Sequence, residues 1–300
     1  MNSWRIRIRP LSPWASPWRS DTIFGSICWR WLELYPRDFE TMIEKFQAGG
    51  EPPFLLSDGW PGNLLPVPAH VRVESEPGAD RKKWKPPLYV PESSFQRIAA
   101  GQDRSAKEVF SAVVQSLTRV QTAIDRHSGT AAKGQLFEID CQYVDSPQDT
   151  LAVYVRTDKH LDRLAACFRA LALTGYGKKS CSGLGEFELL GEPEQCAWLD
   201  VVPNANAFVA LNHFVPARTD PVEGLWRTHV TFPKFHSNSV RNVFKGAIVM
   251  LTPGSVFRMG GARPRPWYGS VVPVPRPEMP KAVHYALCFP APVVWSEATP

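Results

Sequence analysis

The chain has 300 residues, of which 44% are apolar, and it carries a formal charge of +5. This length allows two domains with a sizeable core, the mild basicity does not by itself identify a polyanionic partner, and 29 prolines exclude a helical bundle. Six scattered cysteines without a Cys-x-x-Cys pair give no indication of a zinc or redox site, and no apolar run is long enough to span a membrane, so we expect a cytoplasmic protein.

Residues 4–9 alternate between apolar and basic side chains, which predicts a strand whose one face is formed by Arg5, Arg7 and Arg9. That face is either solvated, which is the commoner outcome for such charges, or available to RNA. A helix is predicted next, over residues 20–34. Ser20 or Asp21 can cap its amino terminus, and apolar residues recur along it at helical spacing.

Residues 50–97 are rich in proline and are interpreted as a long insertion. Within it, residues 81–87 place four basic side chains around Trp84, which is typical either of a solvated loop tip or of an electrostatic finger with a stacking ring. Apolar residues at helical spacing then predict a helix over residues 105–124, followed by a polar turn at residues 125–134.

The remaining pattern predicts strands at residues 135–140 and 150–156, a helix at 159–173 and a strand at 186–190. Together with the first strand and helix, this order resembles interleaved ferredoxin-like units, so the predicted fold class is α+β. Short strands punctuated by glycine dominate the rest of the chain, at residues 207–211, 225–232, 244–251, 256–259 and 284–289.

The most informative segment is residues 174–185, Thr-Gly-Tyr-Gly-Lys-Lys-Ser-Cys-Ser-Gly-Leu-Gly, which we call the glycine loop. It has no Walker A order, and it follows a helix, unlike a dinucleotide-binding glycine loop. Glycines that permit positive φ, together with cations and hydroxyl groups, are suited to binding a phosphate backbone. The candidate residues in this loop are Gly175, Gly177, Lys178, Lys179, Ser180, Ser182, Gly183 and Gly185. The alternative is a helix C-cap at Gly175 followed by a flexible turn.

Catalytic patterns are sparse. The chain has no Gly-x-Ser-x-Gly motif and no His-x-x-x-His or His-x-His pair, so neither a nucleophilic nor a metal site is indicated. Asp125, Arg126 and His127 form the best acid–base cluster, in which His127 can serve a metal-independent RNase as acid or base. We prefer the interpretation that Arg126 and His127 bind phosphate, because no second histidine is paired with His127.

Several segments occur in an order that resembles the RAMP superfamily of CRISPR proteins. They are residues 20–25 (Ser-Asp-Thr-Ile-Phe-Gly) with Cys28 and Trp29, residues 123–126 (Ala-Ile-Asp-Arg) with Gly129 and residues 134–137, the glycine loop, Phe244 with Lys245, residues 254–257, and residues 285–290. Within that superfamily the chain resembles the fourth-subunit family of type III-A (Csm) effector complexes, which is Cas-five-like. Related subunits of type III-B, III-D and type IV complexes share much of this order.

The resemblance implies two ferredoxin-like (RRM-like) lobes with antiparallel sheets, at residues 1–195, including the insertion, and 196–300. It implies a non-catalytic subunit without a cofactor, which grips the 5′ handle of a crRNA and links the backbone RAMP subunit to the large polymerase-like subunit in antiviral defence. The glycine loop, Arg126, His127 and Ser20 are then expected to contact RNA. The insertion at 50–97 would correspond to a thumb-like element.

Two alternatives remain open at this stage. The first is a metal-independent endoribonuclease that matures the crRNA, with His127 as its acid or base. The second is an adaptor that contacts the large subunit and no RNA.

Overall fold

In the computed structural model, the described residues are 1–74, 88–111, 113–145, 149–235, 241–262 and 264–296. The helices in these ranges are α1 (Ser20–Leu34), α2 (Pro36–Gln47), α3 (Glu92–Ala99) and α4 (Leu161–Ala172). The predicted helices at 20–34 and 159–173 are therefore confirmed. No helix of the described part is long and apolar enough to cross a membrane.

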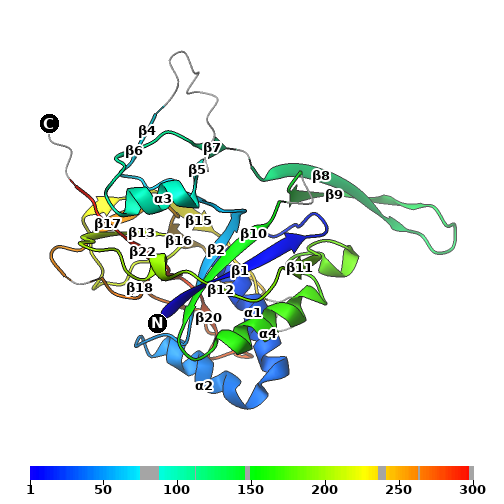
Figure 1. Cartoon of the computed structure of the whole chain (residues 1–300). Coiled ribbons are helices and arrows are strands. Elements are labelled where there is room, and N and C mark those ends of the chain that lie inside the picture. Colours follow the sequence, from blue (N-terminus) through cyan, green and yellow to red (C-terminus); the bar gives the residue numbers. More distant parts are fainter. Residues whose placement is uncertain (75–87, 112, 146–148, 236–240, 263, 297–300) are drawn as a thin grey trace.

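The main sheet contains β1 (Asn2–Pro10), β2 (Leu55–Pro61), β10 (Leu151–Thr157), β11 (Phe187–Leu189) and β12 (Glu194–Gln195). Its strands follow the order β11-β1-β10-β2, all antiparallel, and β12 pairs with β1 beyond the end of β11. Helices α1 and α4 pack on each other and lie on the same side of this sheet (Figure 1). Every residue of β10 is buried, because both faces of the sheet are covered.

The segment 50–97 is not simply an insertion, and that interpretation needs correction. Residues 55–61 form β2, a fully integrated strand of the main sheet, in which Leu55, Leu56 and Ser57 are completely buried. Beyond β2, the chain forms β3 (Leu64–Pro66), β4 (Arg72–Val73) and β5 (Leu88–Pro91) before α3. The basic run at residues 81–87 lies outside the described residues.

The predicted helix at 105–124 is wrong. Its residues form β6 (Ser105–Ala106), β7 (Phe110–Ser111) and the long strand β8 (Gln115–Ile124), which pairs antiparallel with β9 (Ala131–Tyr143). The β8–β9 hairpin extends well away from the rest of the protein (Figure 1). Its β-branched residues, including Thr118, Val120 and Thr122, favour a strand over a helix because their side chains are stiff at χ1.

The second half of the chain is built from short strands, as predicted. One sheet has the order β14-β17-β13-β22, and three further strand pairs lie around it. These strands are β13 (Ala207–Ala210), β14 (Gly224–Leu225), β15 (Thr228–Thr231), β16 (Ile248–Leu251), β17 (Val256–Arg258), β18 (Tyr268–Gly269), β19 (Val272–Pro273), β20 (Val283–His284), β21 (Leu287–Cys288) and β22 (Pro290–Val293). Within the described residues, no α-helix follows α4.

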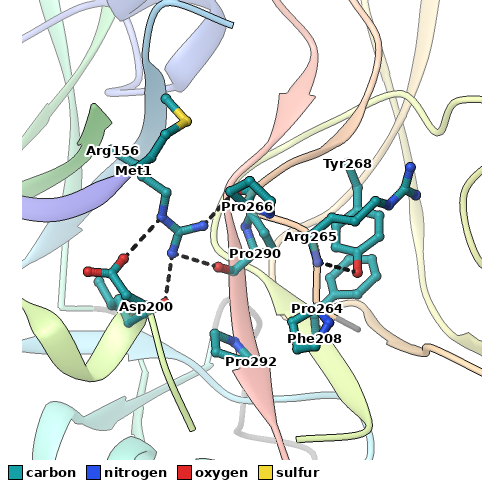
Figure 2. Close-up of a pocket in the computed structure, with 11 residues that line it drawn as sticks. Met1, Arg156, Asp200, Phe208, Pro264, Arg265, Pro266, Tyr268, Pro290 and Pro292 are labelled. Carbon is teal, nitrogen blue, oxygen red and sulfur yellow. Dashed lines mark hydrogen bonds and ion pairs between the residues drawn. The ribbon is translucent and has the colours of Figure 1, made fainter. Parts of the chain in front are cut away.

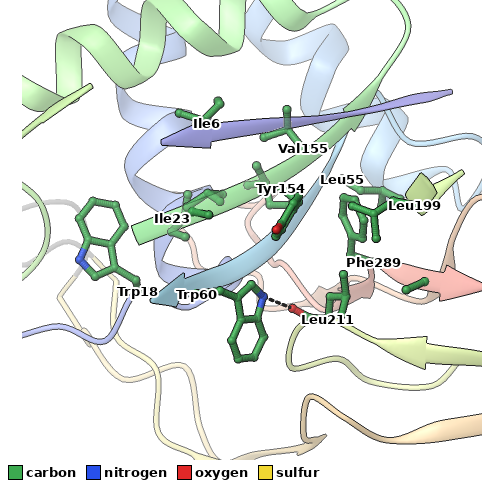
Figure 3. Packing of buried hydrophobic residues seen from close by; sticks show 14 of the residues in the cluster. Ile6, Trp18, Ile23, Leu55, Trp60, Tyr154, Val155, Leu199, Leu211 and Phe289 are labelled. Atoms are coloured by element: carbon green, nitrogen blue, oxygen red, sulfur yellow. Dashed lines mark hydrogen bonds between the residues drawn. The ribbon is translucent and has the colours of Figure 1, made fainter. Parts of the chain in front are cut away.

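A single large hydrophobic cluster joins the two halves of the chain. Figure 3 shows Ile6 and Tyr154 of the main sheet in the same cluster as Phe289 from the end of the chain. The indole of Trp60 in β2 donates a hydrogen bond to the carbonyl of Leu211, which follows β13, at 3.2 Å. The halves therefore share buried surface and a polar link.

Candidate nucleic-acid interface

The glycine loop has the backbone conformation that its composition predicts. Its four glycines all have φ between 71° and 79°, and Lys179 has φ 65°. The requirement for glycine is strictest at Gly185, where a Cβ would lie 2.0 Å from the carbonyl oxygen of Tyr176. At Gly177 a Cβ would lie 2.5 Å from the Cβ of Ser16. The conformation of the loop therefore depends on its glycines.

Tyr176 anchors the loop to the segment that leads into α1. Its ring is fully buried and stacks on Trp18 with centroids 3.9 Å apart, and its hydroxyl donates to the carbonyl of Pro17 at 2.8 Å. The backbone amide of Lys178 donates to the hydroxyl of Ser16 at 2.8 Å. These contacts hold the base of the loop while its crest stays free.

The crest of the loop faces solvent. Lys178, Lys179, Ser182 and Gly183 are exposed, whereas Ser180 is half-buried. Among the described residues, no ion pair involves either lysine. Two adjacent cations without acidic partners on a glycine loop are the arrangement expected of a phosphate-binding surface.

The β8–β9 hairpin contacts this loop at its root. Leu184 is fully buried in a small cluster with Ile139 and Cys141 of β9, and the ammonium group of Lys179 lies 5.0 Å from the centre of the Phe137 ring. The hairpin also exposes apolar side chains: Val120, Ile124, Leu136 and Phe137. The loop and the hairpin root therefore form one surface that combines cations with exposed apolar groups. Sequence reasoning missed Phe137, although the alternation at 135–140 predicted its strand.

Arg126 and His127 are not part of that surface. They lie at the exposed tip of the hairpin, where the carboxylate of Asp125 accepts the backbone amide of His127 at 2.8 Å. Six residues of β9 separate the tip from Phe137, a distance of roughly 20 Å along an extended strand. A turn is present at residues 125–130, but residues 131–134 of the predicted turn belong to β9, and the structure does not bring the turn together with the glycine loop.

Ser20 must be removed from the predicted site. Its side chain is completely buried, and its hydroxyl accepts a hydrogen bond from Asn212 at 3.0 Å, so it cannot contact an RNA. Neither Ser20 nor Asp21 acts as the N-cap residue, which is Arg19. Instead, Asp58 of β2 accepts the backbone amide of Ser20 at 2.8 Å. A carboxylate there also complements the positive end of the helix dipole.

Asp58 also binds the second half of the chain. Its carboxylate accepts from Nδ1 of His213 at 2.7 Å. Burial acts to raise the pKa of Asp58, but the charge and hydrogen bond of His213 and the amide of Ser20 outweigh it and hold that pKa below its usual value. Asp58 is therefore an ionised link between α1, β2 and residue 213.

The arginine face of β1 is not free for RNA, which corrects the second interpretation of that strand. Arg5 forms ion pairs with Glu92 and Glu194, each at 2.6 Å. Arg7 shares Glu194, and Arg9 pairs with Glu188 at 2.7 Å. The acidic partners come from α3, β11 and the start of β12, so they neutralise the face.

Two observations on the described part of the chain bear on metal and small-molecule binding. No group of three or more histidine, cysteine or acidic residues that could hold a metal ion occurs there. One cavity of about 270 Å³ lies beside Arg156, Tyr268 and Pro292 (Figure 2). The Arg156 guanidinium in it already bonds to Asp200 and to the carbonyls of Pro266 and Pro290, so its donors are occupied.

Comparison with known proteins gives a match at the level of structure only. No protein-family model matches the chain, and no curated protein matches it significantly. A chain in the crystal structure of the Csm1-Csm4 cassette in complex with cA4 is 17% identical, with a TM-score of 0.61, and the match covers 99% of this chain and 100% of that chain.

Two further structures agree. A chain in the Csm1-Csm4 cassette in complex with pppApA is 16% identical with a TM-score of 0.60, covering 99% of this chain and all of that one. A chain in the Csm3-Csm4 subcomplex of the type III-A CRISPR-Cas interference complex is 15% identical with a TM-score of 0.56, covering 97% and 99%. The resemblance to a Csm4-like RAMP protein that was predicted from the sequence is thus confirmed for the fold, over the whole chain.

Proposed function

We propose that this protein is a non-catalytic RNA-binding subunit of a type III CRISPR effector complex that grips the 5′ handle of the crRNA. The observation that carries the proposal is the pair Lys178 and Lys179 on the exposed crest of the glycine loop. Neither cation is neutralised by a described acidic side chain, and the hairpin root lies beside them. A phosphate backbone needs that combination of fixed cations and close backbone approach.

The same proposal includes two protein partners. The similar structures contain Csm1 or Csm3 beside Csm4, which supports docking of this chain onto a large polymerase-like subunit and onto a backbone RAMP subunit. Exposed apolar residues on the β8–β9 hairpin are the kind of surface that such subunits cover.

We also propose that residues 1–195 form a ferredoxin-like lobe and residues 196–300 a second one. The strand order β11-β1-β10-β2, with α1 and α4 between strands in the chain, supports the first lobe. The sheet β14-β17-β13-β22 is the centre of the second.

The test is the double variant Lys178→Ala/Lys179→Ala. We expect its affinity for a labelled handle RNA to fall roughly tenfold or more. The slope of log affinity against log salt concentration should become shallower by roughly 0.7 for each phosphate of the single strand that the variant no longer neutralises. The matched control is Arg37→Ala/Lys45→Ala, which removes the same charge from exposed positions of α2. Equal affinities for the two double variants would remove the glycine loop from the RNA site.

Catalysis is tested separately. Incubation of precursor repeat RNA with the purified protein in EDTA should leave the RNA intact, because no described histidine accompanies His127 at the hairpin tip to complete an acid–base pair. Discrete cleavage that disappears in His127→Ala would favour the endoribonuclease instead.

A further inference from the structure

The chain carries a long segment without any acidic residue. Asp and Glu make up 29 of its 300 residues, yet none occurs between Glu223 and Glu278. The same segment contains several cations: Arg227, Lys234, Arg241, Lys245, Arg258, Arg263, Arg265 and Arg276. Arg258 and Arg265 pair with Glu223 and Asp220, which lie just before the segment. The remaining one-sided charge favours a polyanion.

Part of this segment forms an exposed hairpin-like pair, β15 and β16. We define the β15–β16 face as the exposed side chains Arg227, Val230, Phe232, Lys234, Phe244 and Val249. Val230 and Val249 lie directly opposite each other in the register, and both are about half exposed. Phe232 is 69% exposed. Large apolar groups seldom stay this open in a contiguous set unless something binds there.

Cations and rings alternate on this face. The Lys234 ammonium lies 4.7 Å from the centre of the Phe244 ring, and the backbones of these two residues form an isolated bridge. Arg227 directly follows the half-exposed Trp226, which stacks on Phe257 with centroids 5.6 Å apart. Among the described residues, no ion pair involves Arg227 or Lys234.

A chain of contacts connects the strand β15 to the glycine loop, through a residue adjacent to Val230. Nε2 of His229 in β15 lies 3.0 Å from the guanidinium of Arg19. Because arginine only donates, His229 accepts through Nε2 and is neutral in this arrangement. Arg19 directly follows Trp18, whose ring stacks on Tyr176 of the glycine loop. The strand β15 and the base of the glycine loop are therefore connected through Arg19 and the buried Trp18.

We propose that the β15–β16 face is a second binding surface for single-stranded RNA, continuing the strand that the glycine loop holds. This inference rests on the proposed function, and it extends the RNA footprint to the second half of the chain. Exposed rings offer stacking platforms for bases, while free cations beside them pair with phosphates. An acidic protein is the less fitting occupant, because lysine is depleted at the centre of protein interfaces and Lys234 lies over Phe244 there.

The test uses two variants of the full chain. Arg227→Glu/Lys234→Glu reverses the charge of the face, and Phe232→Ala removes an exposed ring without changing charge. Affinity for a fluorescently labelled oligouridine is measured by anisotropy, once with an RNA long enough to cover both surfaces and once with a short one. We expect each variant to weaken binding of the long RNA, the double variant by roughly tenfold or more, and to leave the short RNA unaffected.

Arg37→Glu/Lys45→Glu on α2 is the matched control, and it should bind both RNAs like the unmodified protein. Photo-crosslinking with an RNA that contains 4-thiouridine should also yield RNA-bound peptides from residues 225–249. If Lys178→Ala/Lys179→Ala weakens binding but neither face variant does so at any length, the second surface is refuted while the proposed function stands. If the face variants bind RNA normally but fail to join the partner subunits, the face is a protein interface and the inference is overturned.

Discussion

At the scale of single residues, Asp58 connects segments that are far apart in the sequence. It binds the first amide of α1 through Ser20, and it binds the side chain of His213, so one carboxylate orders three parts of the chain. Nothing in the sequence around residue 58 indicates this role. It arises from distant residues that meet only in the folded protein.

Replacing Asp58 with Asn should reduce the free energy of unfolding by about 2–3 kcal/mol at neutral pH, since the charge-assisted pair with His213 inside the protein is removed. The folded pKa of Asp58 lies below its unfolded value. Its stabilisation is therefore fully present above about pH 3.9 and is lost as the pH falls through the folded pKa.

Urea unfolding at several pH values measures this difference, which should shrink in acid. Asp145→Asn, at an exposed position, is the control and should change the stability by less than about 0.5 kcal/mol. A difference that stays constant down to the lowest pH would show that the Asp58 charge is not its source.

The glycine loop offers a second residue pair for comparison. Gly183 and Gly185 have nearly the same φ, 75° and 71°, but a Cβ at Gly183 meets nothing within 4 Å, whereas one at Gly185 meets the Tyr176 carbonyl at 2.0 Å. Gly183→Ala should cost about 1 kcal/mol from the left-handed backbone alone. Gly185→Ala should cost about 3 kcal/mol or more, because the steric conflict adds to that strain.

Thermal or urea unfolding of both variants measures these two losses of stability. Comparable reductions in stability would mean that the close approach of the two backbone segments is not maintained in solution. We also expect Gly183→Ala to keep most of its RNA affinity, since the lysines of the crest remain in place.

Sequence reasoning succeeded at positions whose role is local and failed where a partner comes from far away. Positive φ at the glycines follows from residue type and was foreseen. Burial of Ser20 depends on Asn212, and neutralisation of Arg5 depends on Glu92 and Glu194. No short-range pattern encodes such pairs.

At the scale of elements, the β8–β9 hairpin extends away from the rest of the protein and is attached at its root (Figure 1). A two-stranded hairpin is only marginally stable alone. This one is held at its root by the packing of Leu184 on Ile139 and Cys141 and by the hydrogen bonds between Trp14 and Gln142. Leu184→Ala should weaken that attachment by about 2–4 kcal/mol.

Hydrogen exchange is the measurement suited to this element. In Leu184→Ala, the amides of β8 and β9 near the root should exchange faster, while those of β1 and β10 stay protected. Leu136→Ala is the control, because its side chain is 70% exposed and packs little. Uniformly faster exchange across the whole protein would contradict a local role for Leu184.

The same hairpin explains the main error in the predicted elements. Apolar residues at 109, 113, 117, 120 and 124 fit a helical period, but residues 115–124 pair along their length with β9. Periodicity alone cannot distinguish a helix from a strand over such a short run, and the β-branched residues indicated the strand more reliably. The strands β1, β9, β10 and β11 were foreseen because their alternation or length was unambiguous.

At the scale of the whole molecule, the two predicted lobes share one core. The large hydrophobic cluster includes Ile6 and Phe54 from the first part and Leu211, Val256 and Phe289 from the second. Asp58 and Trp60 add polar links across the same boundary. We therefore expect the lobes to unfold together, although the sequence suggested a division near residue 195.

Arg156 of β10 provides the sharpest test of that expectation. Its buried guanidinium donates to the carbonyls of Pro266 and Leu199, each at 2.7 Å, and to Pro290 at 3.1 Å, and it lies 4.4 Å from the Phe289 ring centre (Figure 2). Burial lowers its pKa to about 10, against the opposing effect of Asp200, so it is still charged at neutral pH. One side chain thus ties the main sheet to the end of the chain.

Arg156→Met should reduce the free energy of unfolding by about 3–5 kcal/mol, because Asp200 loses its cationic partner and several buried carbonyls lose their donor. Arg156→Lys should recover little, since one ammonium group cannot span carbonyls that a planar fork reaches in different directions. Arg169→Met is the control: Arg169 is half exposed and pairs with Glu192, so its replacement should cost less than about 1 kcal/mol.

Urea unfolding followed by tryptophan fluorescence and far-ultraviolet circular dichroism should give coincident transitions in the unmodified protein and a lower midpoint in Arg156→Met. Two separate transitions in the unmodified protein would show that the lobes fold independently and that the shared core contributes little to their cooperativity.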